Sequence, residues 1–144
     1  MAPAVEIVPV RSADQMAAAY AIRRRVFIDE QRIDENLERD HYDLSALHVL
    51  ALQDGHPAGC GRMVLTAAGA KIGRMAVLPE HRGRGLGRMM LDHLIALARR
   101  NGAVVAYLHA QVAVEGFYLK RGFQPVGEVF EEAGIPHRKM VMPL

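Results

Sequence analysis

The feature that most constrains the fold is a turn rich in glycine and arginine, PEHRGRGLGRMM at residues 79–90, between a strand-like and a helix-like segment. Residues 71–78 before it are largely apolar and of strand length, and Pro79 ends this segment. From Leu86 to Ala98, apolar residues recur every four positions, which predicts an amphipathic helix. Residues 103–110 then read as a buried strand. A strand–helix–strand passage implies parallel pairing through a right-handed crossover.

The other segments complete a mixed sheet. Ser12 and Gln15 have the spacing of a capping box and predict a helix to about Asp29. Asp54-Gly55 is typical of a tight hairpin between two apolar runs. Further strands are expected at residues 5–10, 47–53, 58–66, 124–130 and 137–142, and a short helix at 112–121. The predicted fold class is therefore α/β (an α+β mixed sheet), a single sheet layer flanked by helices.

Length and composition predict one globular domain spanning residues 1–144. With 51% hydrophobic and 24% charged residues, the chain is not of the disordered or fibrous class. No stretch approaches the roughly twenty apolar residues of a membrane span, and the N-terminus does not resemble a signal peptide. Cys60 is the single cysteine, so it forms no internal disulfide, and its apolar surroundings predict a core position. We therefore expect a cytoplasmic protein, and a net charge of +2 gives no argument for nucleic-acid binding.

The glycine-rich turn has the properties of an anion site. A helix N-terminus offers unpaired backbone N–H groups and a partial positive charge. Three glycines leave these N–H groups accessible, and three arginines can add charge-assisted hydrogen bonds. A Walker loop would need a Lys-Ser/Thr pair, and a dinucleotide fingerprint would need a glycine where Arg88 stands. The turn therefore predicts binding of a diphosphate, but neither ATP hydrolysis nor NAD binding.

These residues resemble the GNAT superfamily of N-acetyltransferases. Arg82, Gly85 and Gly87 occupy the positions of the family's Arg/Gln-x-x-Gly-x-Gly/Ala coenzyme A motif. The later segment FYLKRGF, residues 117–123, is similar to the family's Phe-Tyr-x-x-x-Gly-Phe segment. RRRVFIDEQ, LERD, LHAQ and GIPH resemble the small bacterial ElaA-like branch, so that the resemblance extends from about residue 22 to residue 142. It departs at Gln111, where many members carry asparagine.

The resemblance implies an acetyl-CoA-dependent transfer of an acetyl group to a primary amine of a small molecule or a protein. It implies that the fourth and fifth strands splay apart, that the pantetheine arm lies along the fourth, and that a backbone N–H near Met75 or Ala76 faces the thioester oxygen. Tyr118 corresponds to the tyrosine that protonates the leaving sulfur. Coenzyme contacts are expected at Met75, Val77, Arg82, Gly83, Arg84, Gly85, Leu86, Gly87, Arg88 and Gln111. A homodimer is possible, since many relatives dimerise.

Several assignments stay open. The alternative function is a non-catalytic acyl-CoA-binding or sensor module of the same fold. The general base is a water relay or one of Glu115, His109, His48, Glu38 and Glu30. The cluster of Glu38, Asp40, His41, Asp43 and His48 lacks zinc spacing, so no metal is expected. It reads as an acidic patch that receives a cationic amine, or as plain loop capping. Residues 23–25, three consecutive arginines, read mainly as a solvated helix face.

Overall fold

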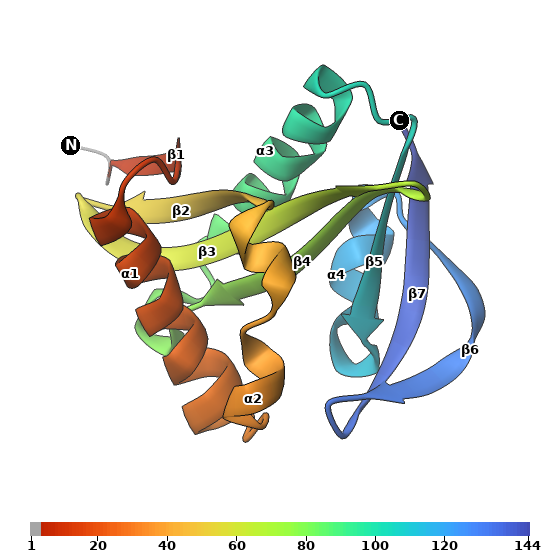
Figure 1. The fold of residues 1–144 in the computed structure, drawn as a ribbon, viewed down its shortest axis with the longest axis horizontal. Coiled ribbons are helices and arrows are strands. Elements are labelled where there is room, and N and C mark those ends of the chain that lie inside the picture. Colours follow the sequence, from red (N-terminus) through yellow and green to blue (C-terminus); the bar gives the residue numbers. More distant parts are fainter. Residues whose placement is uncertain (1–3) are drawn as a thin grey trace.

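The computed structural model describes residues 4–144 and contains one seven-stranded sheet in the order β1-β2-β3-β4-β5-β7-β6 (Figure 1). Neighbouring strands pair antiparallel except β4 and β5, which pair parallel as predicted. The strands are β1 Val5–Pro9, β2 Leu47–Gln53, β3 His56–Thr66, β4 Gly69–Val77, β5 Val105–Gln111, β6 Gln124–Glu132 and β7 Ile135–Pro143. The mixed α/β sheet expected from the sequence is confirmed, and residues 1–3 of the predicted domain lie outside the described residues.

Helices cover both faces of the sheet (Figure 1). They are α1 Ala13–Arg23, α2 Glu35–Glu38, α3 Leu86–Arg100 and α4 Glu115–Arg121. The chain stays helical beyond α1 as predicted, but residues Arg24–Glu30 form a π-helix. Short 3-10 turns occupy His41–Leu44, Pro79–His81 and Val112–Val114. Within residues 4–144, no helix combines the length and the apolar character that a membrane crossing needs.

The core has one part on each side of the sheet, because α1 and α3 each turn an apolar stripe toward it. On the α3 side, Leu91, Leu94 and Ile95 pack with residues of β2, β3, β4, β5 and β7. On the α1 side, Ile22 contributes to a cluster that includes Cys60. Burial raises the pKa of the Cys60 thiol to about 12, so the prediction of a core cysteine is confirmed.

Strands β4 and β5 separate soon after they meet. Their only parallel pairs in the described chain are Ala70 with Ala106 and Lys71 with Tyr107. Gly69 permits this close approach, because a Cβ atom there would lie 2.5 Å from the Val105 carbonyl oxygen. Beyond these pairs the two strands diverge, as Figure 1 shows to the left of and below their shared end. The predicted splaying of the two strands is therefore present and opens a wedge in the middle of the sheet.

Arg23 lies in the core, so the prediction that residues 23–25 form a solvated face is wrong for its first residue. Its side chain is 1% exposed, and its guanidinium donates to Glu38 Oε2 at 2.7 Å and to Asp43 Oδ1 at 2.8 Å. Burial is possible because these two carboxylates neutralise the charge and accept its hydrogen bonds. The next two arginines are exposed, as predicted.

The carboxylates of the acidic cluster form ion pairs with arginines. Arg62 Nη1 lies 2.7 Å from Asp40 Oδ1 and 2.8 Å from Asp43 Oδ1, and Arg74 Nε lies 3.2 Å from Glu38 Oε2. Asp40 also caps the 3-10 turn that follows it, so the loop-capping interpretation is confirmed. The interpretation as a patch that receives an amine stays a prediction. Among residues 4–144, no group of three or more histidine, cysteine or acidic side chains is arranged to hold a metal ion.

Candidate functional site

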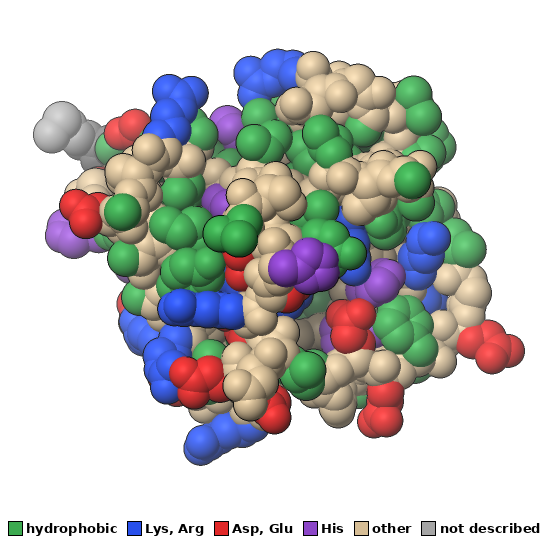
Figure 2. All heavy atoms as spheres, in the orientation of Figure 1, with side chains coloured by type: hydrophobic (Ala, Val, Ile, Leu, Met, Phe, Trp, Pro, Cys, Tyr) green, Lys and Arg blue, Asp and Glu red, His purple; other side chains and the backbone are tan. Residues whose placement is uncertain are grey.

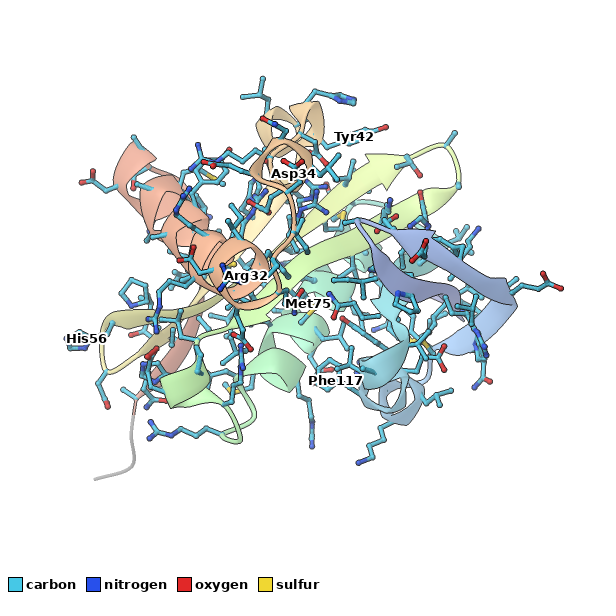
Figure 3. The ribbon with its side chains drawn as sticks, turned by 90° about the horizontal axis from the view of Figure 1, so that it is seen from below. Arg32, Asp34, Tyr42, His56, Met75 and Phe117 are labelled. Atoms are coloured by element: carbon cyan, nitrogen blue, oxygen red, sulfur yellow. The ribbon has the colours of Figure 1, made fainter. Side chains whose placement is uncertain are left out.

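The wedge between β4 and β5 holds a cavity of about 830 Å³. Its lining comes from both sides of the sheet, with Phe27 on the α1 side and Phe117 on the α3 and α4 side. In Figure 3, Met75 of β4 and Phe117 of α4 both lie near the middle of the molecule, beside this opening. Figure 2 shows the face that carries α1 and α2, with histidine and acidic side chains gathered around a hollow near its centre. Because its lining comes from both faces, this cavity can place two reactants on opposite sides of one sheet.

The glycine-rich turn lies at the N-terminus of α3 and has an accessible backbone. Gly83 and Gly85 have φ angles of +80° and +82°, which side chains other than glycine adopt at a cost. No atom lies within 4 Å of a Cβ placed at either position, and Gly85 caps α3 without a side-chain hydrogen bond. Leu86, 1% exposed, anchors the first helical residue in the core. Neighbouring atoms therefore leave the turn uncovered at both glycines.

The arginines of this turn differ in their surroundings. Arg82 donates from Nε to the Val77 carbonyl and from Nη2 to Glu30 Oε1 at 2.7 Å, so its guanidinium already has partners. Arg84 and Arg88 form no ion pair with any residue in 4–144. These two side chains are therefore the better placed to meet an added anion, and the predicted diphosphate contacts stay a prediction.

On β4, the backbone is distorted at the point where the wedge opens. Arg74 has a φ of +52°, and the β3–β4 register shifts around it. A bulge of this kind redirects the following backbone groups. Met75 and Val77, both predicted to contact the pantetheine arm, line the cavity directly after it. Contact of a backbone amide near Met75 or Ala76 with the thioester oxygen stays a prediction.

Gln111 ends β5 and also lines the cavity. Its Nε2 donates to Gln31 Oε1 at 2.8 Å, which links the far end of β5 to the segment after α1. The amide pair spans the two sides of the wedge where β4 and β5 no longer pair. The predicted contact of Gln111 with coenzyme stays a prediction, and the carbonyl oxygen and second N–H of its amide are not used by this hydrogen bond.

Tyr118 of α4 reaches the same cavity from the opposite side. Its ring packs edge-on against Phe117 and Phe123, with centroid distances of 5.0 and 6.0 Å. Burial raises the pKa of its phenol to about 12, so the hydroxyl keeps its proton at neutral pH. The hydroxyl makes no hydrogen bond with another residue of the described chain. It is therefore available as a proton donor to a group bound in the cavity.

Two of the carboxylates considered as general base are held in ion pairs. Glu38 is 2% exposed and contacts Arg23 and Arg74. Glu30 accepts hydrogen bonds from both terminal nitrogens of Arg82, and this contact is the main reason that the pKa of Glu30 is lowered. Because its charged form is stabilised in this way, Glu30 is a weak proton acceptor.

The remaining candidates separate into two that lie off the cavity and one that lies on it. His48 Nε2 is 2.9 Å from the Asp43 carbonyl oxygen, and Glu115 Oε1 is 3.3 Å from Arg138 Nε. Neither residue lines the cavity. His109 of β5 does line it, and its Nδ1 is 2.9 Å from the carboxylate of a residue on β6.

Two further residues of this wall, Glu132 and His137, were not singled out from the sequence as site residues, although the turn that contains them was expected to contribute to acceptor selectivity. Both lie in the segment EEAGIPH, which forms the β6–β7 hairpin. Their position beside β5 follows from the pairing of β7 with β5, in which His137 lies opposite Gln111. The alternation of polar residues along β5 (Tyr107, His109, Gln111) is the one local signal that could have indicated a shared polar face.

The comparisons with known proteins agree with this geometry. The family model described as acetyltransferase (GNAT) domain matches residues 8–144. YyaT of Bacillus subtilis, named as an uncharacterized protein, is 36% identical over 122 residues, covering 83% of this chain and 82% of YyaT. The crystal structure of Escherichia coli ElaA has a TM-score of 0.85 at 27% identity and covers 96% of this chain and 99% of ElaA. A GNAT family acetyltransferase of Elizabethkingia anophelis, solved with acetyl-CoA bound, has a TM-score of 0.74 at 19% identity over 97% of this chain and 98% of that one.

Proposed function

Because the chain belongs to the acetyltransferase (GNAT) family, we propose that it is an N-acetyltransferase that moves the acetyl group of acetyl-CoA to a primary amine of a small molecule or protein. The GNAT fold, the relationship to ElaA, acyl transfer as the reaction class and acetyl-CoA as the family's co-substrate were all expected from the sequence and are confirmed. The amine acceptor and the roles of single residues are our proposal. A homodimer stays a prediction.

The observation that carries the proposal is a single cavity that reaches both the distorted backbone of β4 and the unpartnered hydroxyl of Tyr118. The turn before α3 supplies backbone N–H groups for the coenzyme diphosphate, with Arg84 and Arg88 free to add charge. Met75 and Val77 would then lie along the pantetheine arm. This arrangement leaves the other side of the wedge for the acceptor.

The reaction can be followed atom by atom. The neutral amine attacks the thioester carbon, a C–N bond forms, and the carbonyl oxygen becomes an oxyanion that the Met75 backbone amide stabilises. When the C–S bond breaks, Tyr118 donates its proton to the departing thiolate. The phenolate then takes a proton from the newly acylated nitrogen, which gives the neutral amide and restores Tyr118. The raised pKa of Tyr118 keeps the required proton in place before each cycle.

Two measurements test this function. A saturating ligand at about 100 times its Kd stabilises the native state by about 2.7 kcal/mol, so acetyl-CoA should raise the melting temperature by several degrees. Free thiol should then be released when a panel of primary amines is added with acetyl-CoA. A rise in melting temperature without thiol release would favour the non-catalytic acyl-CoA-binding module, and no response in either measurement would contradict coenzyme binding.

The proposed diphosphate site predicts a specific loss of affinity. In α3, Gly87 lies beside Phe117 and Val77, and a Cβ there would be 3.5 Å from the Phe117 ring and 3.9 Å from a Val77 methyl. Gly87→Val should therefore fill the cavity wall and weaken acetyl-CoA binding at least about tenfold, which corresponds to about 1.4 kcal/mol. Isothermal titration calorimetry measures the effect.

The matched control is Gly116→Val. Gly116 is also helical, but no atom lies within 4 Å of its Cβ position, and it does not line the cavity. This variant should bind acetyl-CoA as the unmodified protein does. Equal affinity losses in the two variants would contradict the placement of the coenzyme beside Gly87.

A further inference from the structure

The acceptor side of the cavity carries a histidine–glutamate pair whose partners come from separate strands. His109 of β5 and Glu132, the last residue of β6, both line the cavity, and His109 Nδ1 lies 2.9 Å from Glu132 Oε1. The side chains are 26% and 44% exposed. Strand β7 lies between β5 and β6 in the sheet, so Glu132 reaches across it to meet His109.

The β6–β7 hairpin fixes the position of the carboxylate. Glu132 pairs with Ile135, and the two residues between them, Ala133 and Gly134, have φ angles of +54° and +76°. Positive φ at both central residues is the geometry of the tight hairpin turns that suit twisted strands. Glu132 therefore lies at a defined point of the sheet rather than on a mobile loop.

Aromatic contacts fix the orientation of the imidazole. The His109 ring meets the Phe130 ring edge-on with a centroid distance of 5.1 Å. The Phe130 ring also stacks with His137, whose Nδ1 lies 2.6 Å from the Ile135 carbonyl oxygen. These contacts limit rotation of the His109 ring and keep its Nδ1 toward Glu132.

The chemistry of the pair follows from this orientation. A carboxylate beside Nδ1 holds the proton on that nitrogen and leaves the Nε2 lone pair free to accept another. Nε2 of His109 makes no hydrogen bond with a residue in 4–144. Hydrogen bonding to His109 is the main cause of the lowered pKa of Glu132, so the carboxylate stays charged beside the imidazole.

Other charged and titratable groups face this pair from each neighbouring strand. Lys139 and His137 of β7 lie beside it, with His137 Nε2 3.8 Å from Glu132 Oε2. Lys71 of β4 acts on Glu132 through its charge. Tyr107 precedes His109 on the same face, and its hydroxyl lies 2.9 Å from Thr66 Oγ1. The charges around the imidazole are therefore two lysines and the Glu132 carboxylate.

We propose, on the basis of the proposed acetyl transfer, that His109 is the general base that takes a proton from the acceptor ammonium, and that Glu132 is the residue that positions it. One proton moves from the ammonium nitrogen to His109 Nε2, which gives the neutral amine that attacks the thioester. The imidazolium returns this proton to solvent after the product leaves. Since Tyr118 gives one proton and regains one, each turnover releases this single proton.

The test uses the panel amine that gives the fastest thiol release with the unmodified protein. His109→Gln should lower kcat/KM at neutral pH by about 10²- to 10⁴-fold, the usual contribution of a general base. It should also remove the acid limb of the pH profile, which is the decrease in rate at low pH caused by protonation of an imidazole. The remaining pH dependence should follow deprotonation of the amine itself. The control is His56→Gln at the first residue of β3, seen at the far left of Figure 3, which should match the unmodified enzyme.

Glu132→Gln keeps the imidazole and tests the positioning role. It should lower kcat/KM about 10- to 100-fold, as loss of an orienting partner does, while the acid limb remains. Both variants should show the same acetyl-CoA-dependent rise in melting temperature as the unmodified protein, which verifies that they fold. A pH profile of His109→Gln that is unchanged from that of the unmodified protein, at near-normal rate, would overturn the base assignment alone. Absence of thiol release by the unmodified protein with every panel amine would instead overturn the acetyl transfer on which it rests.

Discussion

Replacing Tyr118 with phenylalanine is expected to lower the turnover number about a hundredfold or more, because the departing thiolate loses its proton donor. The ring contacts with Phe117 and Phe123 do not involve the hydroxyl, so folding and acetyl-CoA affinity should stay nearly unchanged. Steady-state thiol release measures the first quantity, and calorimetric titration with acetyl-CoA measures the second. A loss confined to turnover would mark an interaction made only in the transition state.

Tyr20→Phe is the matched control for loss of a phenolic hydroxyl. Tyr20 lies on α1 outside the large cavity, where its ring stacks under the guanidinium of Arg39 at 3.7 Å. Its turnover should equal that of the unmodified protein. Because burial raises the pKa of Tyr118 to about 12, ionisation of this phenol should cause no loss of activity between pH 7 and 9. Unchanged turnover in Tyr118→Phe would contradict its assignment as the general acid.

The scaffold of the site could be predicted from the sequence because the patterns that determine its helix, turn and strands are local. Apolar spacing in residues 86–98, Pro79 before the turn and strand-length runs on both sides each act within a few residues. Together they placed a glycine-rich turn at a helix N-terminus and a parallel strand pair around it, as the structure has them. The family resemblance added the splayed strands and Tyr118, which no local pattern could have placed in one cavity.

Contacts between residues that are distant in the sequence could not be predicted from local patterns. The arginines at 23–25 read as a surface run because nothing nearby indicates that Glu38 and Asp43, 15 and 20 residues later, fold back onto the first of them. The five candidate bases were also equivalent in sequence. Only tertiary contacts show that His109 meets Glu132 in the cavity. The other four candidates contact arginines or a carbonyl oxygen, and two of them do not line the cavity.

Arg23→Met is expected to have the largest effect on stability. Removing one partner of a buried ion pair costs about 3–5 kcal/mol, because Glu38 and Asp43 would keep their burial and lose their main donor. Methionine retains much of the side-chain volume, so the loss reports mainly on charge and hydrogen bonding. A domain of this kind has about 5–15 kcal/mol of total stability, so the urea midpoint should fall markedly.

The adjacent arginine gives a matched control. Arg24 lies at the surface with a side chain 54% exposed, and its ion pair with Glu35 is solvated. Arg24→Met should therefore change the free energy of unfolding by less than about 1 kcal/mol. Similar urea midpoints for the two variants would contradict the buried network as a source of stability.

The loss of unfolding free energy caused by Arg23→Met should also depend on pH, and ionisation of Asp43 determines the direction of this dependence. Burial alone would raise the pKa of Asp43, but its hydrogen bonds and charge contacts with Arg23 and Arg62 outweigh burial and hold it at about 2, below the usual 3.8. A lowered carboxyl pKa adds stability above the unfolded value that is lost as pH falls toward the folded one. The unmodified protein should therefore lose this contribution between about pH 4 and pH 2. Protonated Asp43 no longer needs Arg23, so the difference between the two urea midpoints should narrow over the same interval, whereas a constant difference would mean that the charge pair is not its cause.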